Sequence, residues 1–130
     1  MKKILVPTDF SKAAFNALEY AINLSNKLEA EIVLLNAYAV PNSSVMIDLT
    51  DVLREDSING LDKVKTEALE KYPNTKIETV DYNGDLTASV SHCSKNYNID
   101  LVIMGTTGAS GLKETFVGSN TATLIQEINI

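Results

Sequence analysis

Cysteine, arginine and histidine are scarce in this chain of 130 residues, where each occurs once. A single cysteine excludes an internal disulfide, which suits a reducing cytosol and predicts a cytoplasmic protein. No segment approaches the roughly 20 apolar residues that a membrane-spanning helix needs. The start of the chain also lacks the apolar core and the small-residue cleavage site of a signal peptide. We therefore expect no membrane partner.

Positive charge is also in deficit, because 17 acidic residues face 11 lysines and arginines and give a net charge of −6. A general nucleic-acid binder would show a basic face, so nucleic acid is not an expected partner. The chain as a whole repels polyphosphates such as ATP. Any phosphate site must therefore act locally, through backbone dipoles and a bound cation.

Two common phosphate-binding motifs are missing. The pattern Gly-x-x-x-x-Gly-Lys-Ser/Thr does not occur, which excludes a P-loop nucleotide hydrolase. A dinucleotide-binding fold would carry Gly-x-Gly-x-x-Gly after its first strand. That position holds Pro-Thr-Asp-Phe-Ser at residues 7–11, without a glycine.

What the chain does show is an alternation of strands and helices. Apolar runs and helical spacings predict strands at residues 4–6, 32–35, 76–82 and 101–104 and helices at residues 12–28, 51–72, 86–97 and 121–128. Ser11 is the expected N-cap of the first helix, and residues 38–49 are expected to form a loop. The length suits one domain, and strands joined by helices must be parallel. The predicted fold is α/β: a single doubly wound, Rossmann-like parallel sheet with helices on both faces and a polar third strand at one edge.

Glycines follow the last predicted strand at informative positions. Gly105, Gly108 and Gly118-Ser119 form the pattern Gly-x2-Gly-x9-Gly-Ser between that strand and the predicted helix at 121–128. Glycine lets backbone N–H groups approach an anion closely, and a helix N-terminus adds a partial positive charge. This arrangement predicts a cradle for a phosphorylated small molecule, most simply a nucleotide.

Together with Pro-Thr-Asp at residues 7–9, this glycine pattern resembles the universal stress protein family, in particular its ATP-binding branch, over nearly the whole chain. The resemblance implies an adenine nucleotide α-hydrolase-like fold that binds ATP, with Mg²⁺ or Mn²⁺ held on the phosphate oxygens. It implies that the adenosine lies against one set of residues: Pro7, Thr8, Asp9, Ala37, Met104 and Gly105. It implies that the phosphates lie against a second set: Gly108, Gly118, Ser119 and Asn120.

Alternatives to these roles stay open. Asp9 could cap the first helix, Gly105 and Gly108 could be ordinary turn glycines, and Met104 could be a core residue. Three functions fit: an ATP-binding regulator of the stress response, a slow ATP hydrolase of the same fold group, and a dimerisation module without a nucleotide. We favour the regulator and assign no catalytic residue, because the loop supplies donors but neither a general base nor an arginine.

The end of the chain departs from the family pattern. Family members continue after the last helix with a strand that completes the sheet and often pairs with a second subunit. Here residues 1–130 are expected to form one universal stress protein-like domain without that strand, either truncated or the first of two tandem domains. The strand at residues 101–104 would then have an open edge, which favours a homo-oligomer or pairing with a tandem domain.

Overall fold

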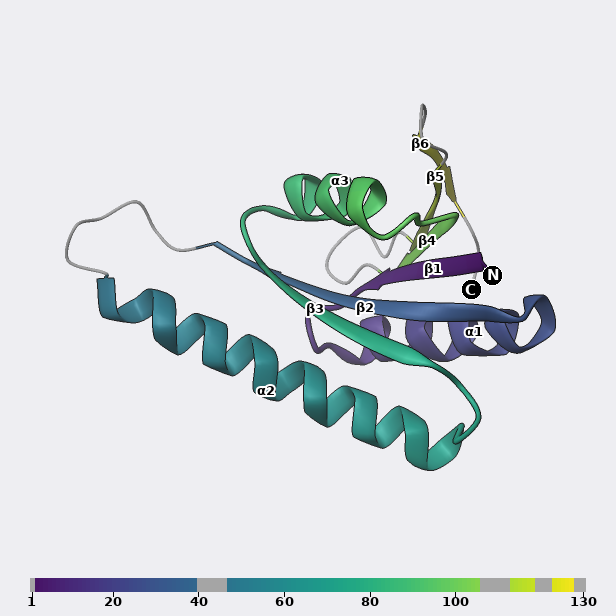
Figure 1. The fold of residues 1–130 in the computed structure, drawn as a ribbon, viewed down its shortest axis with the longest axis horizontal. Coiled ribbons are helices and arrows are strands. Elements are labelled where there is room, and N and C mark those ends of the chain that lie inside the picture. Colours follow the sequence, from purple (N-terminus) through teal and green to yellow (C-terminus); the bar gives the residue numbers. More distant parts are fainter. Residues whose placement is uncertain (1, 40–46, 106–112, 119–122, 128–130) are drawn as a thin grey trace.

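The computed structural model describes residues 2–39, 47–105, 113–118 and 123–127. In these ranges strands and helices alternate, and the last two strands form a hairpin (Figure 1). In chain order the elements are β1 (Lys2–Pro7), α1 (Lys12–Leu28), β2 (Ala30–Tyr38), α2 (Ile47–Lys71), β3 (Ile77–Asn83), α3 (Leu86–Asn96), β4 (Leu101–Gly105), β5 (Lys113–Gly118) and β6 (Thr123–Glu127).

The strands form one sheet in the order β3-β2-β1-β4-β5-β6. The first four in this order are parallel, and Ile4 of β1 lies opposite Ile32 of β2 on one side and Leu101 of β4 on the other. The chain winds outward from β1 to β3 and then crosses to the other side of β1, so its winding direction reverses between β1 and β4. The predicted doubly wound sheet is confirmed, with β1 and β4 inside it and the polar β3 at an edge.

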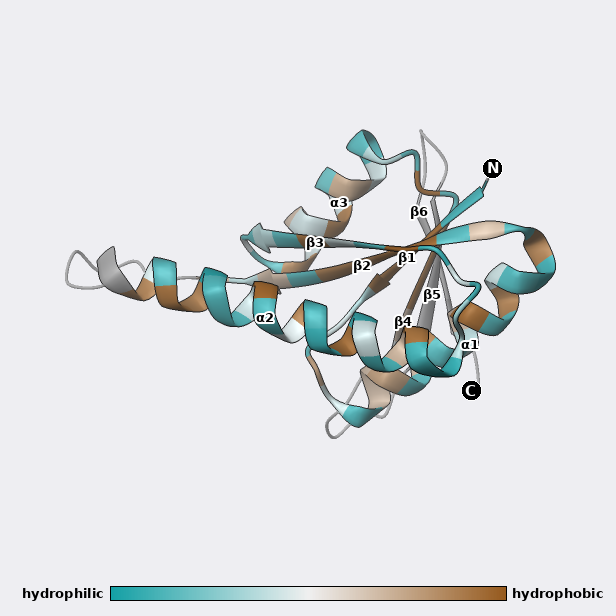
Figure 2. Ribbon diagram, turned by 60° about the horizontal axis from the view of Figure 1, so that its bottom comes forward, coloured by the Kyte–Doolittle hydropathy of each residue, from teal (hydrophilic) through white to brown (hydrophobic). Residues whose placement is uncertain are grey.

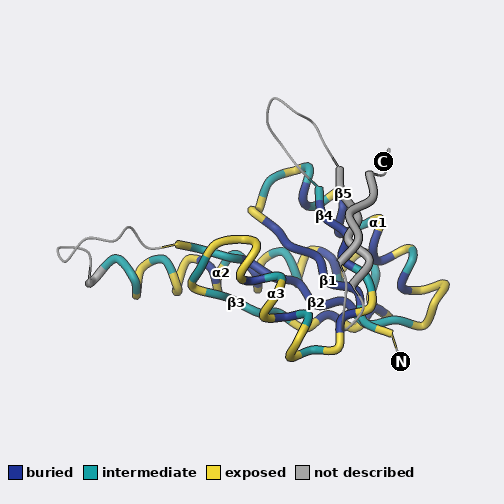
Figure 3. Tube along the Cα trace, turned by 90° about the horizontal axis from the view of Figure 1, so that it is seen from above, coloured by how far each residue is buried: buried dark blue, intermediate teal, exposed yellow. Residues whose placement is uncertain are grey.

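Two layers of core cover the sheet. Along β1, Ile4 and Val6 face one core cluster and Leu5 faces the other, as the alternation of side chains in a strand requires. Helices α1 and α2 cover the first face and α3 covers the second (Figures 1 and 2). The central strands are buried, whereas the outer turns of α2 are exposed (Figure 3).

The predicted start of α1 is confirmed. Ser11 has an extended backbone, and its Oγ accepts a hydrogen bond from the backbone N–H of Ala14 at 3.1 Å. The buried face of this helix consists of Ala14, Ala17, Leu18, Ala21, Ile22 and Ser25. Leu28 is 42% exposed because the helix ends there and the chain turns back through a left-handed Glu29.

The loop predicted at residues 38–49 is wrong at both ends. Tyr38 belongs to β2, where it lies opposite Asn83 of β3, and α2 begins at Ile47. Pairing with β3 extends β2 beyond its apolar run at residues 32–35. No helix in the described residues is long and apolar enough to cross a membrane.

The helix predicted at residues 121–128 is also wrong. Thr123–Glu127 form β6, which pairs antiparallel with β5. An eight-residue helix is marginal on its own, whereas a segment containing Thr123 and Ile125 suits a strand once a partner strand is available. In turn β5 pairs antiparallel with β4, so the predicted open edge of β4 is covered by the same chain.

Candidate functional site

A cavity of about 400 Å³ opens at the carboxyl ends of the parallel strands. Open α/β sheets bind their ligands at this edge, where the winding direction reverses. The volume lies within the roughly 300–1,000 Å³ that small-molecule sites usually have. Six residues that the sequence assigned to the site line this cavity: Pro7, Thr8, Asp9, Ala37, Met104 and Gly105.

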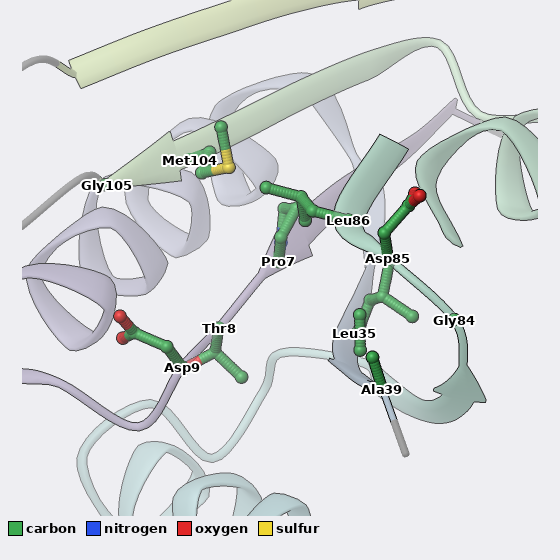
Figure 4. Close-up of a pocket in the computed structure, with 11 residues that line it drawn as sticks. Pro7, Thr8, Asp9, Leu35, Ala39, Gly84, Asp85, Leu86, Met104 and Gly105 are labelled. Carbon is green, nitrogen blue, oxygen red and sulfur yellow. The ribbon is translucent and has the colours of Figure 1, made fainter. Parts of the chain in front are cut away.

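Five further residues line the cavity and were missed as site residues by the sequence analysis. Leu35 and Ala39 come from the end of β2, and Gly84, Asp85 and Leu86 join β3 to α3 (Figure 4). A sequence signal for them existed, since residues 84–86 follow a predicted parallel strand at the same edge as residues 7–9. The apolar side chains among them, with Met104, give the cavity an apolar middle.

The turn after β1 is held firmly by β2. The backbone N–H of Thr8 donates to the carbonyl of Leu35 at 2.7 Å, and Asn36 Nδ2 donates to the carbonyl of Thr8 at 2.8 Å. Thr8 Oγ1 in turn accepts from the N–H of Phe10 at 3.0 Å. Thr8 and Asn36 are each only 8% exposed, so Asn36 is a positioning residue for the wall of the cavity.

Two carboxylates line the cavity. Asp9 Oδ1 accepts from the N–H of Ser11 at 2.9 Å, so Asp9 braces the turn while Ser11 is the helix cap. Asp85 is the N-cap of α3 and accepts from the N–H of Ala88 at 2.7 Å. The two carboxylates lie on opposite sides of the lining residues (Figure 4). Among the described lining residues there is no lysine or arginine, so hydroxyl and amino groups suit this cavity better than a bare polyphosphate.

Gly105 has a packing role that the sequence analysis did not include. A Cβ at this position would overlap the backbone carbonyl of Ala13 and come within 3.1 Å of the Cβ of Ala17. The end of β4 therefore contacts the first turns of α1 directly. Glycine at residue 105 brings the strand end and the helix together beside the cavity.

Of the four remaining predicted site residues, the structure describes only Gly118. Gly108, Ser119 and Asn120 lie outside the described residues. Gly118 ends β5, which runs antiparallel to β4 and pairs Lys113 with Gly105 and Phe116 with Val102. Gly118 consequently lies toward the amino end of β4, opposite to the cavity. Residues 123–127, predicted as part of the helix after this glycine, form a strand and supply no helix dipole to a phosphate.

His92 and Cys93 belong to neither a metal centre nor the cavity lining in the described part of the chain. The Cys93 side chain is fully buried, and this burial raises the pKa of its thiol to about 11. A thiol with that pKa is protonated at neutral pH and is a poor nucleophile. The His92 ring packs at a centroid distance of 4.9 Å from the ring of Tyr82.

Comparison with known proteins agrees with this geometry. The model of the universal stress protein family matches residues 1–130. Universal stress protein MJ0531 of Methanocaldococcus jannaschii is 31% identical over 124 residues, which cover 91% of this chain and 72% of the relative. The solved structure of MJ0577 from the same organism has a TM-score of 0.70 and 27% identity, covering 85% of this chain and 78% of that one.

A universal stress protein solved in complex with cAMP has the same fold, with a TM-score of 0.64 and 18% identity over 80% of this chain and 75% of that chain. The match to the family model spans the whole chain, and the strand order and the position of the cavity are those expected for such a fold. The chain therefore belongs to the universal stress protein family.

Proposed function

We propose that this chain is an ATP-binding regulatory protein whose nucleotide enters the cavity at the carboxyl ends of the strands. The observation that carries the proposal is the meeting of Pro7, Thr8 and Asp9 with Met104 and Gly105 around a cavity of about 400 Å³ at the point where the sheet reverses its winding. This position is the usual ligand site of open α/β sheets.

The cavity suits the adenosine part of the ligand. Its apolar lining, which includes Ala37, Leu86 and Met104, offers surface for a flat base. Asp9 is a carboxylate acceptor, and a ribose presents two hydroxyl donors. In the proposal Pro7, Thr8 and Asp9 contact the adenosine, Ala37 contacts the base, and Met104 and Gly105 line the ribose side.

The phosphates would extend past Gly105 toward Gly108. The position of Gly118 at the far end of β5 gives no support to its predicted phosphate contact, nor to the contacts predicted for Ser119 and Asn120, which follow it in the sequence. Since the chain carries a net charge of −6 and the cavity two carboxylates, the triphosphate needs a counter-charge. We propose Mg²⁺ or Mn²⁺, bound through the phosphate oxygens.

A cyclic or monophosphate adenine nucleotide is the second candidate. The described cavity lining has two carboxylates and neither lysine nor arginine, which favours a ligand with fewer negative charges. A related fold solved in complex with cAMP supports the same choice.

Regulation is favoured over catalysis. Phosphoryl transfer needs charge stabilisation and a positioned water. The single arginine, Arg54, lies on α2 with its guanidinium 3.9 Å from Asp51 and does not line the cavity. We propose that the protein acts in the cytoplasm, as its single cysteine suggests, and as a homo-oligomer or beside a tandem domain, as the family resemblance implies.

Calorimetric titration with MgATP, ATP plus EDTA, cAMP and adenosine tests the proposal. We expect MgATP to bind at micromolar strength, about −8 kcal/mol, and ATP with EDTA to bind more weakly, while EDTA leaves adenosine binding unchanged. Tighter binding of cAMP than of MgATP would select the second candidate. Absence of binding by all four at about millimolar concentration would reject both.

A further inference from the structure

A second cavity, of about 350 Å³, lies between the start of α1 and the middle of α2. Its apolar wall is formed by Phe10, Phe15 and Val64, and its polar lining includes Lys12, Lys63 and Glu67. Like the first cavity, its volume is in the usual range for small-molecule sites. Thr8 lines both cavities, so the turn after β1 separates the two.

The aromatic wall requires two locally unfavourable features, a positive φ at Phe10 and a glycine inside α2. Phe10 has a φ of 67°, which is unusual for a bulky residue and persists only where the surroundings fix it. Gly60 lies inside α2, where glycine costs about 1 kcal/mol relative to alanine. A Cβ at Gly60 would lie 2.6 Å from Cζ of Phe10, so the ring lies against the bare helix backbone. Phe10 is nevertheless 42% exposed, so one side of the ring faces outward.

The two cavities carry opposite charge. Lys12 and Lys63 are exposed side chains on α1 and α2, and Glu67 is the one carboxylate among the described residues that line this cavity. A local positive excess is notable in a chain with a net charge of −6. The two ammonium groups supply positive charge for an anion here.

From this lining we infer that the cavity between α1 and α2 is a second binding site, which takes a small amphipathic anion. Its ligand has an apolar body of one or two rings, which packs on Phe10, Phe15 and Val64. A carboxylate or sulfonate on that body pairs with Lys12 and Lys63. Both parts are needed, since exposed ion pairs contribute little by themselves and the apolar wall cannot select a charge.

Titration with naphthalene-2-sulfonate, followed by amide NMR shifts, locates the site. We expect the largest shifts at Phe10, Gly60 and Val64, saturating at about millimolar concentration or below. The neutral analogue 2-naphthalenemethanol should shift the same amides but bind more weakly. Largest shifts at Gly84 and Met104, or no shifts at about 5 mM sulfonate, would overturn the inference.

Variants separate the charge requirement from the apolar one. Replacing both lysines, Lys12→Met with Lys63→Met, should weaken sulfonate binding about fivefold or more and leave the alcohol unaffected. The matched control, Lys2→Met with Lys27→Met, removes the same charge from exposed sites away from the cavity and should change neither ligand. Equal weakening in both double variants would mean that only the net charge of the protein matters, and it would contradict the inference. Because all four lysines are exposed, both proteins should fold.

Discussion

The two cavities lie on either side of the turn at residues 8–10 and differ in how they are made. The first follows from topology, because parallel strands end together where the sheet reverses its winding. The second follows from side-chain choice, because it needs Phe10 in a left-handed conformation and a glycine opposite it on α2. One is lined by two carboxylates, Asp9 and Asp85, and the other by two lysines against one carboxylate. Such a contrast predicts two ligands that bind through different groups: a nucleotide whose adenosine meets carboxylates in the first cavity, and an anion that meets lysines in the second.

Alanine substitutions at Gly105 and at Gly60 should differ most in their effect on stability. At Gly105 a new Cβ meets the backbone of Ala13, which cannot move without shifting α1, so Gly105→Ala should cost about 1–3 kcal/mol of stability. At Gly60 a new Cβ meets only the ring of Phe10, which can turn outward, and the helix gains about 1 kcal/mol. Gly60→Ala should therefore change stability by less than about 1 kcal/mol. Urea unfolding of the two variants measures this, and equal stabilities would contradict the packing assigned to Gly105.

Loss of the Asp9 carboxylate should affect ligand binding in the first cavity and not in the second. Asp9→Ala should weaken nucleotide binding about tenfold or more, since a hydrogen bond to a charged group contributes roughly 1.5–3 kcal/mol. Naphthalene-2-sulfonate binding should not weaken. Asp62→Ala, an exposed site on α2, removes the same charge as a control. Equal nucleotide affinity in the two variants would mean that Asp9 does not contact the nucleotide.

A variant at Asn36 tests whether β2 holds Thr8, which lines both cavities, in place. Asn36→Ala leaves the buried carbonyl of Thr8 without its side-chain donor, which should cost about 1–3 kcal/mol of stability. Nucleotide binding should weaken too, and adenosine as much as MgATP, because the defect lies at the Thr8 wall. Normal stability with weakened binding would instead mean that Asn36 contacts the ligand directly.

The smallest effect concerns the contact between the middle of α1 and the end of α2, the two helices that frame the second cavity. Glu19 Oε2 accepts from Lys71 Nζ at 2.7 Å and from the Tyr72 hydroxyl at 2.9 Å, and the Lys71 bond is the main cause that lowers the pKa of Glu19 below its ordinary 4.5. A lowered folded-state pKa means that this contribution is present above pH 4.5 and is lost as the pH falls through the lower pKa. The melting temperature of Glu19→Gln should therefore lie slightly below that of the parent at pH 7 and approach it near pH 3. A gap that grows on acidification would contradict this sign.

Sequence reasoning found the first cavity because its parts follow strand ends. The family resemblance assigned residues 7–9 and Gly105 to the site, and the sheet brings them together because β1 and β4 are parallel neighbours that end at the same edge. The second cavity had no such signal, since Phe10 and Gly60 are far apart in the sequence and belong to no shared motif. The prediction for residues 121–128 was wrong for a related reason, because the pairing of Thr123–Glu127 with β5 cannot be read from the pattern of that segment alone and outweighs a short helical pattern.

Amide NMR shifts during a MgATP titration test most directly whether the nucleotide binds in the first cavity or in the second. We predict the largest shifts at Asp9, Gly84, Met104 and Gly105, with saturation at about micromolar concentration. The Asp9→Ala protein should show the same pattern at tenfold or higher concentration, about what one charged hydrogen bond contributes. Largest shifts at Gly60 and Val64, or no saturable shifts at about millimolar MgATP, would contradict the account.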